Sequence, residues 1–280
     1  ALPKADVVFA TSLPLTVGIP GYIGARWHRA AFLFEVRDIC PESDVIAGYI
    51  RQGSLIERAL ALGADLIEID IWATRGRKFL VFHDVFLERL GRHNNWTMYL
   101  TQEEIEDLRR EHRGLLYLEE ALGLVEGKVG LLVELKRTRH AEASYAWIEE
   151  ELLRILDAEG AIPWVTLISF DHLSLLRFKE LRSEVRVGMI CAGEWLNLWE
   201  EVDRLSPAVI LPHWAQTTPH LVEEAHRRGI AVYPWIVNRR DLWEIFREMG
   251  VDGVVTDEFE ELLEFLGRKR EVNHDSLLPR

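Results

Sequence analysis

Short apolar runs alternate along the chain with segments whose apolar residues recur every three or four positions. The runs predict β-strands, and the longer spacing predicts amphipathic helices. Strands are expected at Asp65–Trp72, Lys78–His83, Val129–Lys136, Trp164–Phe170, Val185–Cys191, Ala208–Leu211, Ile230–Val237 and Gly253–Asp257. Helices are expected at Leu55–Leu62, Thr101–Arg110, Leu118–Val125, Ala141–Ala158, His172–Leu181, Leu196–Leu205, Pro219–Arg228, Arg240–Met249 and Phe259–Gly267. Strands that alternate with helices indicate βαβ units and a parallel sheet.

The second of these strands does not fit a parallel sheet. Asp65–Trp72 and Lys78–His83 are joined by a few residues that contain Arg75-Gly76, which is too short for a parallel crossover. We therefore expect Lys78–His83 to fold back as a β-hairpin. Seven parallel strands remain, and one more before Asp65 gives the eight strands of an α/β fold, the (β/α)8 TIM barrel.

The length of 280 residues suits one such barrel. We predict a single domain over residues 1–267, with an N-terminal extension or inserted loop over about residues 1–47. Residues 268–280 are polar and are expected to form a flexible tail.

The charge balance restricts the partners. The formal net charge of −13 opposes binding to a phosphate backbone, so nucleic acid is excluded as a partner. An anionic substrate would need a local positive charge, such as that of a metal ion. The two isolated cysteines, Cys40 and Cys191, fit a reducing compartment, and we expect a cytoplasmic protein.

The segment Thr11–Phe34 is unusually apolar for an N-terminal segment. It suits a cover over the bottom of the barrel. Peripheral contact with a membrane is the alternative use of the same segment. No apolar run reaches the length that spans a bilayer.

Acidic residues stand inside two of the predicted strands. Glu68 and Asp70 are two positions apart and so face the same side of their strand, and Glu134 lies near the end of the next parallel strand. Buried like charges repel and lose hydration, so they need a partner. A hard divalent cation, Mg²⁺ or Ca²⁺, is the simplest partner for three carboxylates. The alternative is that these acids pair with arginines and lysines of the barrel.

His83 ends the hairpin strand, where it returns toward the same edge. An imidazole titrates near neutral pH and can serve as a general acid or base. The adjacent Asp84 would either orient this ring or cap the following turn.

The order of these motifs resembles the glycerophosphodiester phosphodiesterase family. The resembling segments are LGADLIEIDI, FLVFHD, LTQEEIEDL, YLEEAL, LLVELK, LISFD, GIAVYPWIVN and GVDGVVTDEF, from about Leu62 to Phe259. The resemblance implies a TIM barrel with a divalent metal held by carboxylates and two histidines that serve as acid and base. It matches the three acids with the metal ligands and His83 with one catalytic histidine. It matches Lys136 with a phosphate-side lysine and Trp235 with a residue of the substrate pocket.

The first histidine of the family's pattern has two imperfect candidates. WHRAAF supplies His28 and Arg29, and CPESD follows it, but the stretch up to Glu68 is then longer than the family usually has. DVIAGYIRQGSLIERAL has a spacing closer to the related sphingomyelinase D group, but it places Gly48-Tyr49 at the histidine position. We favour His28 as the second proton carrier and Arg29 as a phosphate ligand, because a phenol with a pKa near 10 is a poor substitute at neutral pH.

The expected activity is metal-dependent hydrolysis of glycerophosphodiesters to glycerol 3-phosphate and an alcohol. The partner would be a small-molecule phosphodiester. The alternatives are cleavage of lysophospholipids or sphingomyelin, and a catalytically inactive barrel that binds a phosphorylated ligand. Trp195, Trp199 and Trp214 are candidates for an apolar substrate groove.

Overall fold

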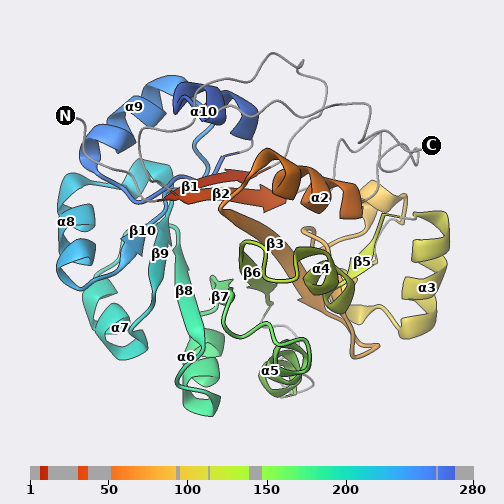
Figure 1. The fold of residues 1–280 in the computed structure, drawn as a ribbon. Helices are drawn as coiled ribbons and strands as arrows, with labels where there is room; N and C mark the ends of the chain where they lie inside the picture. The colour runs from red at the N-terminus through yellow and green to blue at the C-terminus, as the bar shows by residue number, and fades with distance from the viewer. Residues whose placement is uncertain are drawn as a thin grey trace.

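The computed structural model describes residues 7–11, 31–36, 52–92, 95–112, 114–138, 147–256 and 258–268. Within these ranges, eight parallel strands form one sheet (Figure 1). In sheet order they are β1 (Val7–Thr11), β2 (Ala31–Val36), β3 (Leu66–Ala73), β6 (Gly130–Lys136), β7 (Val165–Ser169), β8 (Arg186–Cys191), β9 (Val209–Pro212) and β10 (Ala231–Val232). Parallel strands that follow one another in chain order are the arrangement of a (β/α)8 barrel, so the predicted fold class is confirmed.

Helices follow most of these strands. Figure 1 shows α6 to α10 ranged around strands β7 to β10. The helices are α2 (Gln52–Leu62), α3 (Gln102–Glu111), α4 (Leu118–Val125), α5 (Ile148–Ala158), α6 (His172–Leu181), α7 (Leu198–Leu205), α8 (Pro219–Arg227), α9 (Arg240–Met249) and α10 (Phe259–Phe265). The predicted ranges coincide with α4, α6 and α9. In the described part of the chain, no helix combines the length and the hydropathy that a membrane span requires.

The strand prediction was wrong at both ends of the sheet. Two strands, β1 and β2, precede Asp65, where the sequence argument needed only one. The run Gly253–Asp257 does not form a regular strand over its described residues, 253–256. Its backbone still bonds to the chain after β10, because the Val255 amide donates to the Pro234 carbonyl at 2.8 Å and the Val237 amide to the Val255 carbonyl at 2.7 Å. The run therefore lies beside the predicted neighbour, but without a continuous ladder.

Two further boundaries differ from the sequence prediction. The strand expected over Ile230–Val237 is reduced to β10, since regular pairing with β9 stops after Val232. The helix expected from Ala141 begins at Ile148, and residues 139–146 lie outside the described ranges.

Side-chain alternation along the strands divides the barrel into two apolar layers. One set of strand residues packs outward against the helices; on β3 it includes Ile67, Ile69 and Ile71. The alternate set packs together on the opposite, inner face of the strands, and its members are Leu132, Ile168, Ile190, Val209, Leu211, Tyr233 and Val255. The two acids of β3 alternate with its outward isoleucines and therefore belong to the inner face.

A hairpin extension follows β3, as predicted. Strand β4 (Phe79–Val81) pairs antiparallel with β3, and the short β5 (Leu116–Tyr117), which the sequence analysis did not predict, pairs antiparallel with β4. This extension has its own apolar cluster, which comprises Trp72, Leu80, Phe82, Leu87, Leu90, Met98, Leu100, Ile105, Leu108, Leu115 and Tyr117. The hairpin is therefore held by a second, smaller core and has a fixed path after β4.

Candidate active site

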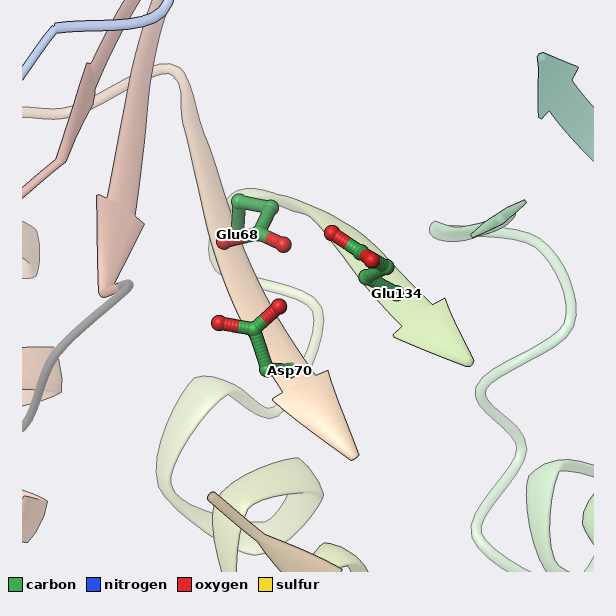
Figure 2. A group of neighbouring side chains, drawn as sticks. All are labelled: Glu68, Asp70 and Glu134. Carbon is green, nitrogen blue, oxygen red and sulfur yellow. The ribbon is translucent and has the colours of Figure 1, made fainter. Parts of the chain in front are cut away.

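Three carboxylates meet on the inner face of the sheet. Glu68 and Asp70 come from β3, and Glu134 comes from the adjacent β6, where it is the direct cross-strand partner of Asp70. Figure 2 shows the three side chains directed toward one another. One ligand oxygen from each lies within 4.8 Å of those of the other two, and each residue is about 1% exposed. The parallel register of β3 and β6 thus builds the cluster that the sequence predicted.

Lys136 lies beside two of these acids. Its Nζ atom is 2.9 Å from Oδ1 of Asp70 and 2.7 Å from Oε1 of Glu134. Burial opposes the charge of this ammonium, but the charges of Asp70 and Glu134 outweigh burial and raise the pKa of Lys136 well above its ordinary value. Lys136 is therefore cationic, and part of the alternative interpretation, in which barrel lysines pair with the acids, is correct.

The donor set can also hold a metal ion. One ammonium balances one of the three negative charges that Glu68, Asp70 and Glu134 carry when ionised. Buried charges in excess are unfavourable unless another cation or hydrogen bonds compensate them. Carboxylate oxygens on neighbouring strands are hard donors, which suit a hard divalent cation better than a soft one. The chemistry of the cluster thus fits a metal ion.

His83 lies close to this cluster along the backbone. The Phe82 amide donates to the carbonyl of Asp70 at 3.0 Å, so the backbone pairing with β3 extends to Phe82. His83 is the next residue. Its Nδ1 atom lies 2.8 Å from Oδ1 of Asp84. A carboxylate can only accept, so Nδ1 carries the hydrogen and, in the neutral ring, Nε2 carries the lone pair. Asp84 therefore orients the imidazole, which is one of the two roles considered for it.

Other contacts fix the loop that carries His83. The indole Nε1 of Trp72 donates to the carbonyl of His83 at 3.1 Å, and the Thr97 hydroxyl donates to the carbonyl of Asp84 at 2.7 Å. Thr97 is fully buried. The histidine is thus anchored both to β3 and to the extension that follows β4.

Trp235 belongs to a wall of aromatic rings that follow three strand ends. Its ring meets Phe170 edge-on at 5.4 Å between centroids and His213 at 5.2 Å, and His213 contacts Trp214 at 5.6 Å. The Trp235 indole donates to the carbonyl of Leu211 at 2.7 Å. Sequence reasoning gave Phe170 no role, although its place directly after a buried strand was a signal.

The three tryptophans proposed for an apolar substrate groove differ in their burial and contacts. Trp195 and Trp199 are partly buried and pack against the main core, and the Arg228 guanidinium lies over the Trp199 ring at 4.7 Å. Trp214 alone of the three is exposed. His213 caps the short helical turn after β9, where its Nδ1 accepts from the Ala215 amide.

A buried ionic network directly follows Lys136, and sequence reasoning missed it. Arg137 contacts the carboxylate of Glu149 and donates to the Ser174 hydroxyl at 2.8 Å. Its Nε atom is 3.7 Å from Asp171. Because side chains alternate along a strand, Arg137 leaves β6 on the side opposite Lys136, toward α5 and α6. The network joins the ends of β6 and β7 to these two helices.

Four residues of the sequence-based site lie outside the described ranges. They are His28, Arg29, Gly48 and Tyr49. The choice between His28 and the Gly48-Tyr49 segment therefore stays a prediction.

Solved structures of phosphodiesterases share this fold. A glycerophosphodiester phosphodiesterase from Parabacteroides distasonis has a TM-score of 0.69 at 20% identity, over 94% of this chain and 98% of its own. A phosphodiesterase from Oleispira antarctica, in complex with the product sn-glycerol-3-phosphate, has a TM-score of 0.67 at 17% identity, over 95% and 97%. This chain thus shares the TIM-barrel fold of these phosphodiesterases.

Sequence comparison extends this likeness. Residues 55–261 match the model of the Glycerophosphoryl diester phosphodiesterase family. A glycerophosphodiester phosphodiesterase from Caldanaerobacter subterraneus subsp. tengcongensis is 27% identical over 217 residues, which are 74% of this chain and 88% of the relative. The protein is an enzyme of the phosphoric diester hydrolase class. Within that class, the chain belongs to the glycerophosphoryl diester phosphodiesterase family.

Proposed function

We propose that this enzyme hydrolyses glycerophosphodiesters to sn-glycerol 3-phosphate and an alcohol, and that it depends on Mg²⁺ or Ca²⁺. The observation that carries the proposal is the buried carboxylate cluster with Lys136 at its edge, since it combines a site for a hard cation with a fixed positive charge. The product named for the Oleispira antarctica relative supports the substrate class.

In this proposal, Glu68, Asp70 and Glu134 hold the divalent ion. When bound, the ion supplies positive charge that offsets the negative charge of the phosphodiester and of its transition state. Lys136, together with Arg29, binds phosphate oxygens. Its ammonium lies 2.7 Å from the Glu134 carboxylate, which orients it at the edge of the cluster.

Proton transfer is assigned to two histidines. His83, oriented by Asp84 at 2.8 Å, either removes a proton from the nucleophile or donates one to the leaving alkoxide, and His28 takes the other role. The nucleophile is water, which gives glycerol 3-phosphate directly, or a neighbouring hydroxyl of the substrate, which expels the alcohol and gives a cyclic phosphate that water then opens. Trp235 and the rings beside it border the pocket for the part of the substrate away from the phosphate.

The test is release of glycerol 3-phosphate from glycerophosphocholine with Mg²⁺, with Ca²⁺ and with EDTA. We expect metal-dependent release, and His83→Ala should lower kcat roughly 10²-fold or more. His226→Ala is the matched control, because His226 lies near the end of α8 and pairs with Asp252 at 2.8 Å, and neither residue belongs to the candidate site.

Three results would contradict this assignment. Release by a folded His83→Ala variant at the normal rate would exclude His83 as a proton carrier. Equal release with EDTA would exclude the metal dependence. Binding of glycerophosphocholine without turnover would favour the inactive, ligand-binding barrel.

A further inference from the structure

Two buried side chains hold the backbone of the candidate proton carrier and of the residue after it. The Trp72 indole donates to the carbonyl of His83 at 3.1 Å. The Thr97 hydroxyl donates to the carbonyl of Asp84, the next residue, at 2.7 Å. Trp72 is 3% exposed and Thr97 is fully buried, so water cannot readily compensate for the loss of either donor.

Trp72 joins His83 to the strand that carries two of the acids. It lies two residues beyond Asp70 on β3, so both side chains leave the strand on the same face. The Phe82 amide donates to the Asp70 carbonyl at 3.0 Å, and the bond from the indole extends this connection to the next residue, His83. A backbone bond and a side-chain bond to β3 therefore constrain the separation between the acids and His83.

Thr97 holds the same segment from a later part of the chain. It begins the short helical turn η2 (Thr97–Tyr99), which belongs to the extension after β4. Its amide donates to the carbonyl of Val85 at 2.9 Å, while its hydroxyl bonds to the carbonyl of Asp84. A rotation of the Asp84 backbone that carried its carboxylate away from Nδ1 of His83 would have to break the hydroxyl bond.

We propose that Trp72 and Thr97 are positioning residues for the reaction, which hold the His83–Asp84 pair in register with the carboxylate cluster. In this assignment neither side chain touches the substrate, and each acts through the peptide unit that it bonds. The inference rests on the role of His83 in the proposed function. Proton transfer requires the ring within hydrogen-bond reach of the reacting atom, and a shift of about 1 Å can lower the rate about 10²-fold.

The first test replaces each donor by a side chain that lacks it. Trp72→Phe and Thr97→Val should each lower kcat for glycerophosphocholine about tenfold or more and change KM less than about twofold, because the ring is displaced and substrate binding is not. Thr97→Ser, which retains the hydroxyl, should restore kcat to within about threefold of the wild-type value.

Two buried bonds of the same kind provide matched controls. The Trp243 indole donates to the Val237 carbonyl at 2.5 Å, and Trp243 is 2% exposed. The Thr74 hydroxyl donates to the Lys78 carbonyl at 2.9 Å across the hairpin turn, and Thr74 is fully buried. Trp243→Phe and Thr74→Val should lower the urea midpoint of unfolding about as much as the corresponding test variants, but keep kcat within about twofold of the wild type.

The second test observes the His83 ring without turnover. Nδ1 of the neutral ring carries the hydrogen because it faces the Asp84 carboxylate. Nitrogen NMR of the histidine rings at alkaline pH distinguishes the two tautomers, and the His83 signals are those that His83→Ala lacks. We expect a single tautomer for His83 in the wild type and in the two controls, and a mixture in Trp72→Phe and Thr97→Val.

The two proposals fail in different ways. A slow His83→Ala variant, together with normal kcat in both test variants or equal losses in variants and controls, would overturn the positioning role and leave the proposed function in place. A normal rate for His83→Ala would contradict the proposed role of His83. The tautomer mixture would then still support the hold on the ring, whereas a single tautomer in both test variants would overturn it.

Discussion

Among single residues, Arg137 occupies a position where its removal should be unusually costly. The Glu149 carboxylate that it contacts is 5% exposed, and the Ser174 hydroxyl lies 2.9 Å from the same carboxylate. Arg137→Met would leave this carboxylate buried without its cation, and should lower the free energy of unfolding by about 3–5 kcal/mol. The Arg137→Met/Glu149→Leu double variant removes both charges and should cost clearly less than Arg137→Met alone. Urea unfolding of the two variants and the wild type measures the difference.

A double variant at least as unstable as Arg137→Met would contradict this account of the network. Ser183→Ala, on the exposed turn after α6, serves as a control for the measurement, because the described contact there is made by the Ser183 carbonyl and not by its hydroxyl.

The sequence predicted some residues of the site and not others. Glu68, Asp70 and Glu134 could be predicted because charged residues at a spacing of two inside apolar strands have few explanations. Arg137 directly follows Lys136, and Phe170 ends a predicted strand. Their partners, however, lie on α5, α6 and the chain after β10. Their contacts depend on packing, which no local pattern records.

At the scale of secondary-structure elements, α3 offers a test of a pH-dependent helix end. Thr101 precedes the helix, and its hydroxyl accepts from the Glu104 amide while the Glu104 carboxylate accepts from the Thr101 amide. The bond from the Thr101 amide, and next the bond from its hydroxyl, lower the pKa of Glu104 below its ordinary value of 4.5. Glu104 therefore stabilises the fold fully above that pH, and the contribution is lost as the pH falls through the lowered pKa.

Thr101→Ala should accordingly cost about 1 kcal/mol in the free energy of unfolding near neutral pH. The cost should shrink when the pH falls well below 4.5, because protonated Glu104 is the weaker acceptor. Thr218→Ala is the matched control, since Thr218 caps α8 by accepting from the Leu221 amide and has no glutamate three residues later. Urea unfolding at the two pH values measures both costs. An equal pH dependence for the two variants would contradict the role of Glu104.

The ends of a helix were predicted well where a capping residue marks them in the sequence. Asp171 before α6 and Gly250 after α9 are such signals, since one caps the helix start and the other adopts a left-handed conformation at the helix end. The run at Gly253 has the composition of a strand, but its hydrogen bonds follow an irregular path beside residues 234–237. Strand composition predicts burial there; it does not predict ladder geometry.

For the whole molecule, the alternation of strands and helices was enough to predict the barrel, because parallel sheets need covered faces and crossover helices. The extension after β3 was predicted only as a hairpin. Its separate core is built from Trp72, the segment after β4 and α3, and only the three-dimensional structure shows these parts packed together. The barrel thus positions the acids, while the extension positions His83.

We propose that Glu68, Asp70 and Glu134 form one divalent-cation site. The most direct measurement is calorimetric titration of the metal-stripped enzyme with Mg²⁺ and with Ca²⁺, beside the Asp70→Asn/Glu134→Gln double variant. Glu194→Gln, which removes an exposed carboxylate that is not part of the cluster, is the control. We expect one ion bound per chain for the wild type and the control, and none for a folded double variant. Equal binding by the double variant, or no binding by the wild type, would contradict it.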